Sequence, residues 1–338
     1  MPQYLYTALA GENKTSIFSM DPDTGHLEFK QDVPLNGSPG PLAVAPEQNF
    51  MYAGLRSTRE ISSFRIDQRT GSLSMIGTVS LESDPCFMTT DRSGRFLLSA
   101  YYGAGRVSVH PISANGAANA PPVEWLATAD KAHCIQLDSS NRFAFVPHVM
   151  TANVIFQFRF DESTGKLVPG DVPRALPPEG VGPRHFCFHP NQDFAYFDNE
   201  QGSSVTAYRF DPSAGTVTPF QTVSTLPDDF DGSNSCAQIH IAPSGDFLYA
   251  SNRGHDSIVI FAIDAAAGEL TPIGQQPTLE TPRVFNLDPA GRFLFVGGLV
   301  SGELASYRID TRTGTLEPLE TYAVGEQPMW VLVLQLGE

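Results

Sequence analysis

The chain of 338 residues has little positive charge, few cysteines and no long hydrophobic run. Its 21 Lys and Arg residues face 37 Asp and Glu residues, which gives a net charge of −16. Nucleic-acid binding requires a basic face, and a membrane span requires about 18 consecutive apolar residues. The first residues also show no basic segment followed by an apolar one, as a secretion signal would. We therefore expect a globular cytoplasmic protein with no nucleic-acid or membrane partner.

The cysteines are too few and too far apart for a disulfide framework or a zinc site. We expect free thiols at all four positions, which are Cys86, Cys134, Cys187 and Cys236. His185 and His189 bracket one of them, but residues four apart on a strand lie about 13 Å apart and cannot share one metal ion. The acidic loop Asp228–Asp231 lacks the spacing and the closing Glu of an EF-hand. We predict no metal and no cofactor, and the role of this loop stays open.

Glycine and proline are abundant, with 29 and 27 residues, and they recur at regular intervals. One motif is a strand that ends in a polar or Pro-containing turn, then Gly, then in most copies Leu or Val, as in RFDESTGKL and RIDTRTGTL. It occurs seven times, 45 to 53 residues apart, which indicates a repeat architecture. The glycines of the seven copies are Gly25, Gly71, Gly116, Gly165, Gly215, Gly268 and Gly314.

A second motif has a small residue or Pro, an apolar strand, a polar turn and an aromatic-rich strand. Its first aromatic lies 11 residues after the opening residue in six copies, as in Pro183 and Phe194. The seventh opening residue, Pro328, has no such partner before Glu338. The strand around Tyr4 matches the missing part, so we expect the N- and C-terminal segments to share one unit.

Each repeat contains about four short alternating strands, and no segment sustains a helical period. This pattern predicts an all-β fold, a seven-bladed β-propeller with four-stranded blades, whose ring is closed by N- and C-terminal strands in one blade. We expect residues 1–338 to form a single domain. A parallel β-helix, the main alternative, would need shorter repeats and no split unit.

Charged and aromatic side chains occur where the inner strand of a blade begins and where its antiparallel neighbour ends, and these points lie at the same mouth of the channel. Because guanidinium groups match carboxylate and phosphate oxygens, four arginines at one mouth predict a small anionic ligand. Tyr102 and Trp330 occupy the same positions and are candidate substrate contacts. The charged and histidine residues are Arg56, His133, Arg184, His185, Glu200, Arg253 and Arg283.

Each of these residues also has a purely structural interpretation. The arginines could pair with nearby acids such as Glu60 or Asp256. Glu200 could act as a general base or hold an arginine in place. Either histidine could transfer a proton or be a hydrogen-bonded residue at a strand end.

Several stretches closely resemble the seven-bladed lactonase family, which includes bacterial propeller-type 6-phosphogluconolactonases and fungal 3-carboxy-cis,cis-muconate lactonizing enzymes. They are GVGPRHFCFHPNQDFAYFDNEQGSSV, AQIHIAPSGDFLYASNRGHDSI, TPRVFNLDPAGRFLFVGG and YAVGEQPMWVLV, and the resemblance spans essentially the whole chain. The bacterial branch is nearer to this chain in length and in amino-acid sequence. The resemblance implies catalytic roles for four residues and substrate contacts for residues in adjacent matching motifs. The four are His133, Arg184, Glu200 and Arg253, and the adjacent ones are His185 and Arg283.

The resemblance implies hydrolysis of a sugar δ-lactone, 6-phosphogluconolactone above all, as in the pentose phosphate pathway. The charge at the mouth suits an anionic substrate for cycloisomerisation of a carboxylated muconate equally well. A third hypothesis is a noncatalytic propeller that binds protein partners through an exposed face. The sequence leaves open which reaction occurs, which residue is the general base and what the oligomeric state is.

Overall fold

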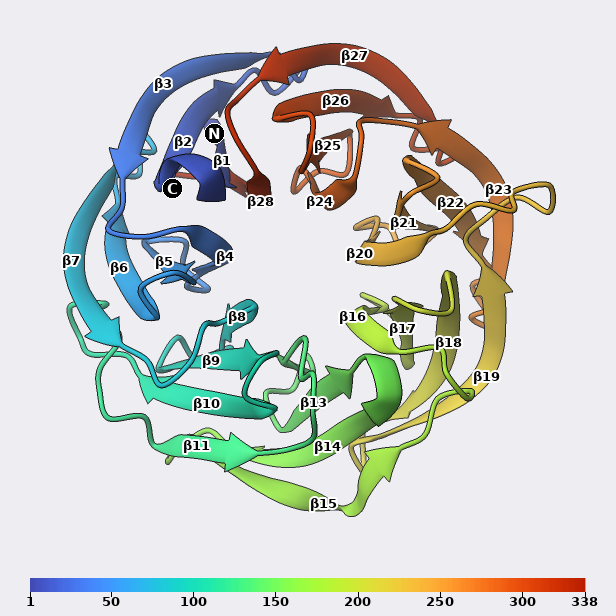
Figure 1. The fold of residues 1–338 in the computed structure, drawn as a ribbon, viewed down its shortest axis with the longest axis horizontal. Coiled ribbons are helices and arrows are strands. Elements are labelled where there is room, and N and C mark those ends of the chain that lie inside the picture. The colour runs from blue at the N-terminus through green and yellow to red at the C-terminus, as the bar shows by residue number, and fades with distance from the viewer. Residues whose placement is uncertain (338) are drawn as a thin grey trace.

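The computed structural model describes residues 1–337, which form 28 strands and two short 3-10 helices, Ala10–Glu12 and Met150–Ala152. The strands make seven four-stranded antiparallel sheets arranged around a central channel (Figure 1). The predicted seven-bladed propeller is therefore confirmed. No helix among the described residues has the length and the hydropathy needed to cross a membrane.

We number the blades along the chain and give the strands of each from the channel outward. Blades 1 to 3 contain β4 (Pro39–Val44), β5 (Phe50–Leu55), β6 (Glu60–Ile66) and β7 (Leu73–Ser80); β8 (Phe87–Thr90), β9 (Phe96–Tyr101), β10 (Arg106–Pro111) and β11 (Glu124–Ala127); and β12 (Gln136–Leu137), β13 (Phe143–His148), β14 (Val154–Asp161) and β15 (Lys166–Ala175).

The remaining blades include the one that joins the two ends of the chain. Blades 4 to 7 contain β16 (Pro183–Phe188), β17 (Phe194–Asn199), β18 (Ser204–Asp211) and β19 (Thr216–Ser224); β20 (Ser235–Ile241), β21 (Phe247–Arg253), β22 (Ser257–Ile263) and β23 (Leu270–Pro277); β24 (Pro282–Leu287), β25 (Phe293–Gly298), β26 (Glu303–Ile309) and β27 (Leu316–Ala323); and β28 (Pro328–Gln335), β1 (Gln3–Leu9), β2 (Lys14–Met20) and β3 (Leu27–Pro34).

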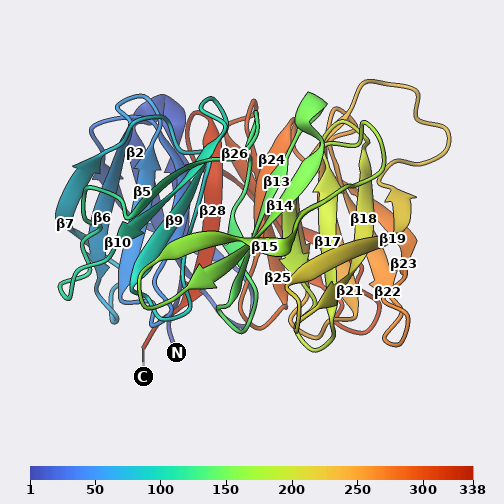
Figure 2. The same ribbon diagram turned by 90° about the horizontal axis from the view of Figure 1, so that it is seen from below.

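Blade 7 closes the ring, because its inner strand is C-terminal and its other strands are N-terminal. β1 pairs antiparallel with β28 over its whole length, and Tyr4 lies opposite Leu334. The pairing satisfies the backbone of both terminal strands and leaves no open sheet edge between them. The closure expected from the split repeat is confirmed, and both termini lie on the same side of the ring (Figure 2).

The glycines of the first repeat motif form the contacts between neighbouring blades. All seven have a left-handed backbone, with φ between 68° and 90°. Each lies against the first aromatic ring of the second strand in the preceding blade, where a Cβ atom would overlap that ring. Tyrosines reinforce the contact, because the Tyr6 and Tyr52 hydroxyls donate hydrogen bonds to the carbonyls of Gly71 and Gly116 at 2.7 and 2.9 Å. The seven pairs are Gly25–Phe293, Gly71–Tyr4, Gly116–Phe50, Gly165–Phe96, Gly215–Phe143, Gly268–Phe194 and Gly314–Phe247.

The inner strands of several blades contain a bulge near the mouth of the channel. In blade 4, Pro183 pairs with Asn199 and Phe186 pairs with Phe197, so β16 has one residue more than β17 between these two pairs. A bulge turns side chains away from the regular alternation of a strand. Because of the bulge, Arg184 and His185 have no paired residue on β17, and both side chains can face the mouth of the channel.

Replacing one of the seven glycines that contact the preceding blade should destabilise the propeller. Gly215→Ala is expected to lower the free energy of unfolding by about 2–5 kcal/mol, because alanine disfavours the left-handed backbone and its methyl group overlaps the Phe143 ring. Gly274→Ala on β23 is the control, since its Cβ would meet Ile260 at an ordinary 3.7 Å. Chemical denaturation measures both variants, and equal stabilities would contradict the proposed contact.

Candidate active site

Two arginines share one carboxylate at the mouth of the channel. Arg184 comes from β16, Glu200 from the turn after β17, and Arg253 from the end of β21. Arg184 Nε donates to Glu200 Oε2 at 3.0 Å, and Arg253 Nη2 lies 3.4 Å from Glu200 Oε1. The Arg184 side chain is only 2% exposed and that of Glu200 19%, so the pairing is shielded from water. Both guanidinium groups are thus fixed before a ligand arrives.

Two further arginines stand beside this group. Arg56 pairs with Asp84, Nη2 to Oδ2 at 2.8 Å, and not with Glu60 or Asp256, the partners suggested by the sequence. Arg283 on β24 has no carboxylate within ion-pair distance in the part of the chain that is described. Burial, followed by repulsion from the other three arginines, lowers the pKa of Arg283 to about 9. A guanidinium stays protonated at neutral pH, so this mouth holds a positive charge that an anionic ligand would balance.

Two buried histidines lie next to the arginines. The rings of His133 and His185 are 5.1 Å apart, and His185 Nε2 is 3.5 Å from Arg184 Nη1. Burial, followed by repulsion from Arg184, lowers the pKa of both imidazoles well below the ordinary value. Both are therefore neutral at pH 7. His133 Nδ1 is buried and has no hydrogen-bond partner among residues 1–337.

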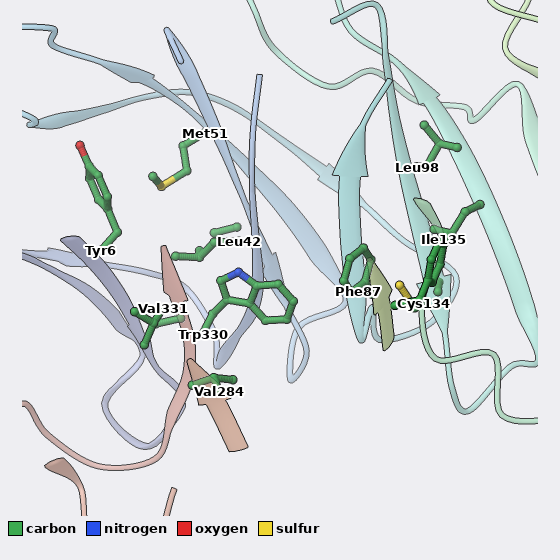
Figure 3. Close-up of a cluster of buried hydrophobic side chains, with 14 of the residues drawn as sticks. Tyr6, Leu42, Met51, Phe87, Leu98, Cys134, Ile135, Val284, Trp330 and Val331 are labelled. Atoms are coloured by element: carbon green, nitrogen blue, oxygen red, sulfur yellow. The ribbon is translucent and has the colours of Figure 1, made fainter. Parts of the chain in front are cut away.

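Aromatic side chains pack beside the histidines in the channel. Phe87 packs edge-on against His185 and Trp330, with ring centroids 5.2 and 5.6 Å away. Figure 3 shows Phe87 and Trp330 in a cluster of buried hydrophobic side chains from the inner and second strands of the blades. A separate cavity of about 230 Å³ lies farther along the channel and is also lined by His185 and Trp330. Trp330 thus contributes to the floor of the site.

A larger cavity of about 900 Å³ opens beside the floor, against loops of blades 6 and 7. Arg56, Arg283 and Met329 line it together with the turn of residues 299–302 and with Glu326 from the connection between β27 and β28. A narrow gap of about 10 Å³ continues from the same arginines to Arg184 and Trp330. The space that can hold a ligand therefore lies at Arg56 and Arg283, and only the narrow gap connects it to Arg184.

Tyr102 covers the opposite side of the mouth. Its ring packs edge-on against His133 at 5.8 Å, and Lys131 Nζ lies 4.5 Å from the ring centroid. The structure thus brings every candidate residue of the sequence to one mouth. The acidic loop between β19 and β20 projects from the ring on the side away from the termini (Figure 2). Its Asp228, Asp229 and Asp231 side chains are exposed, while Phe230 packs on His255.

Sequence reasoning missed two carboxylates, Asp84 and Asp198. Asp84 lies in the connection between β7 and β8 and shows no pattern of its own. Asp198 lies four residues after the first aromatic of its strand, where other blades have Gly54, Ala100, Pro147, Ser251 and Gly297. A lone charge at a repeat position that is otherwise uncharged was the signal that could have revealed it. Nowhere among residues 1–337 do three His, Cys, Asp or Glu side chains group as they would around a metal ion.

The family model described as "Lactonase, 7-bladed beta-propeller" matches residues 3–333. The chain belongs to this lactonase family. It is 37% identical over 337 residues to a 6-phosphogluconolactonase of Pectobacterium atrosepticum, covering 99% of this chain and 100% of that one. It is 35% identical to a 6-phosphogluconolactonase of Serratia proteamaculans, covering 99% of both chains. Among solved structures, a periplasmic gluconolactonase of Pseudomonas aeruginosa superposes with a TM-score of 0.92 at 25% identity, covering 100% of both chains. The family resemblance drawn from the sequence is confirmed.

Binding of an anion to the unbalanced positive charge at the mouth can be tested without a substrate. Inorganic phosphate should raise the thermal midpoint of the wild-type protein, because an anion that binds the native state stabilises it by mass action. Arg283→Gln should lose most of that increase. Arg312→Gln, at a side chain 85% exposed, should keep it. An equal phosphate effect in Arg283→Gln and wild type would contradict an anion site at Arg283.

Proposed function

We propose that residues 1–338 act as one domain that hydrolyses a sugar δ-lactone, 6-phosphogluconolactone, to 6-phosphogluconate. The observation that carries the anionic nature of the substrate is the excess positive charge at the mouth, where Arg283 lacks a carboxylate beside two arginines that share Glu200. The similarity to relatives named 6-phosphogluconolactonase supports the same substrate. Because a phosphorylated sugar acid does not cross a membrane unaided, we place the reaction in the cytoplasm.

The arginines divide into two groups with different roles. Arg56 and Arg283 line the widest part of the cavity and bind the phosphate of the substrate. Arg184 and Arg253 face the lactone carbonyl. Since Glu200 holds them in position, their remaining N–H groups stabilise the oxyanion without reorganisation when water adds to the carbonyl.

His133 is the general base in this mechanism. It is neutral at pH 7 and Nδ1 is free, whereas both oxygens of Glu200 already face guanidinium groups. His133 takes a proton from water as the water oxygen attacks the carbonyl carbon. When the bond from that carbon to the ring oxygen breaks, the imidazolium returns the proton to the ring oxygen. Tyr102 and His185 shape the walls around the lactone ring.

The direct test is the formation of 6-phosphogluconate from freshly prepared 6-phosphogluconolactone, measured against the spontaneous reaction. The wild-type protein should accelerate hydrolysis, and it should prefer this substrate to unphosphorylated gluconolactone. No acceleration above the background would refute the proposal. Turnover of a carboxylated muconate without consumption of water would establish cycloisomerisation instead. Inactivity on all three would favour the noncatalytic scaffold.

Two variants distinguish the base from the residue that holds the arginines. His133→Gln should lower kcat by about 10²–10³-fold with little change in KM, because it removes the proton acceptor. Glu200→Gln should lower kcat less and raise KM, since it loosens Arg184 and Arg253. Steady-state kinetics on both variants decides between them. A larger loss of kcat in Glu200→Gln than in His133→Gln would make Glu200 the base.

A chelator should leave the rate unchanged, because in this mechanism guanidinium groups supply the positive charge at the carbonyl. The experiment compares turnover before and after dialysis against EDTA, with and without added magnesium or zinc. A loss of rate that one of these ions restores would contradict a metal-independent reaction.

A further inference from the structure

Asp198 is a buried carboxyl beside the arginines that the proposed mechanism does not use. It lies on β17, the second strand of blade 4, and is 0% exposed. The repeat position that it occupies holds an uncharged residue in blades 1 to 3, 5 and 6. An aspartate is almost never buried so completely unless it is paired, because taking its charge out of water is costly.

The carboxyl group fills the bulge in β16. Asp198 Oδ1 accepts a hydrogen bond from the backbone N–H of His185 at 2.7 Å. Blade 5 has the same arrangement in neutral form, where Ser251 Oγ accepts from the N–H of Gln238 at 3.1 Å. A hydroxyl therefore suffices to satisfy a bulged strand. The carboxylate at blade 4 adds a charge that the backbone does not require.

The Asp198 carboxyl group is surrounded by other ionisable side chains. Burial raises the pKa of Asp198 to about 6, and Glu200 adds to this rise, while Arg184, the His185 N–H and Arg253 oppose it. Asp198 Oδ2 is buried without a hydrogen-bond partner among residues 1–337. The neighbouring His185 imidazole is neutral, and three thiols near Asp198 are kept protonated by burial. They are Cys134 from blade 3, Cys187 from β16 and Cys236 from β20.

We propose that Asp198 is a positioning residue for the lactonase reaction. Its hydrogen bond fixes the strand that carries Arg184 and His185, and its negative charge, which makes no ion pair of its own within the described part of the chain, attracts the Arg184 and Arg253 guanidinium groups that Glu200 binds. Three arginines repel one another here, and Glu200 alone offsets only one of their charges. The ionised Asp198 offsets a second. When it is protonated, the repulsion displaces the more exposed Arg253 and the oxyanion loses a donor.

This role rests on the proposed function and predicts a pH dependence. Activity should rise with pH through about 6 as Asp198 ionises. The limb due to His133 lies lower, because the pKa of that imidazole is well below its ordinary value. Asp198→Asn keeps an oxygen for the His185 N–H but cannot ionise. At pH 7.5 its kcat should be about 10-fold lower than wild type, with KM changed less than about 3-fold.

The pH profiles of the two proteins should also differ. The wild-type kcat should fall between pH 7.5 and 5, while that of Asp198→Asn should fall less and keep only the part that comes from the substrate phosphate. The phosphate of the substrate titrates near 6 as well, but it contributes equally to both proteins. Ser251→Ala is the matched control, because it removes the corresponding group of blade 5 and should keep the wild-type profile. If Asp198→Asn does not fold, Asp198→Ser, which copies blade 5, replaces it.

Thermal stability tests the buried charge without any activity. A carboxyl whose pKa is raised by folding stabilises the native state while protonated, and this stabilisation is lost as the pH rises through about 6. The thermal midpoint of Asp198→Asn relative to wild type should therefore increase from pH 5 to pH 7.5. If the difference between the two thermal midpoints is the same at every pH in this range, Asp198 does not ionise there and the proposal is wrong.

The kinetic outcomes separate this inference from the proposed function. A wild-type protein without lactonase activity overturns both, and the wild-type assay alone reveals it. An active wild-type protein whose Asp198→Asn variant keeps both kcat and pH profile overturns the positioning role while the proposed function stands.

Discussion

The contact between a left-handed glycine and an aromatic ring of the preceding blade is the constraint on which the rest of this structure depends. It occurs at all seven junctions, and at the closure it links Gly71 to Tyr4 of the N-terminal strand. A junction of this kind tolerates no side chain, so neighbouring blades keep a constant separation and orientation. The inner strands then converge on one channel, and residues far apart in the sequence meet at its mouth.

The mouth combines this rigid frame with a strong imbalance of charge. The protein carries a net charge of −16, yet four arginines lie within one small region. Bulges in the inner strands provide the extra residues that face the mouth, as Arg184 and His185 do in blade 4. Glu200, Asp84 and Asp198 offset part of the positive charge. The remainder matches an anionic substrate, while burial and the arginines keep the two histidines neutral.

The repeats made the fold predictable, because the distances between glycines and between opening residues and aromatics follow directly from the blade geometry. The same arithmetic placed Arg184, Glu200 and Arg253 at one mouth. It could not supply the partner of Arg56, which depends on the path of the β7–β8 connection, or the hydrogen bond of Asp198, which exists only because β16 is bulged. Repeat spacing gives the position of a residue in its blade, but side-chain pairing between blades depends on local irregularities of register.

A crystal structure of the protein with 6-phosphogluconate, the product of the proposed reaction, would test the central claim most directly. The account predicts the phosphate against Arg56 and Arg283 and the carboxylate between Arg184 and Arg253, within reach of His133. Product bound with the two ends reversed would contradict the division of roles among the arginines. Product bound away from this mouth would contradict the active site itself.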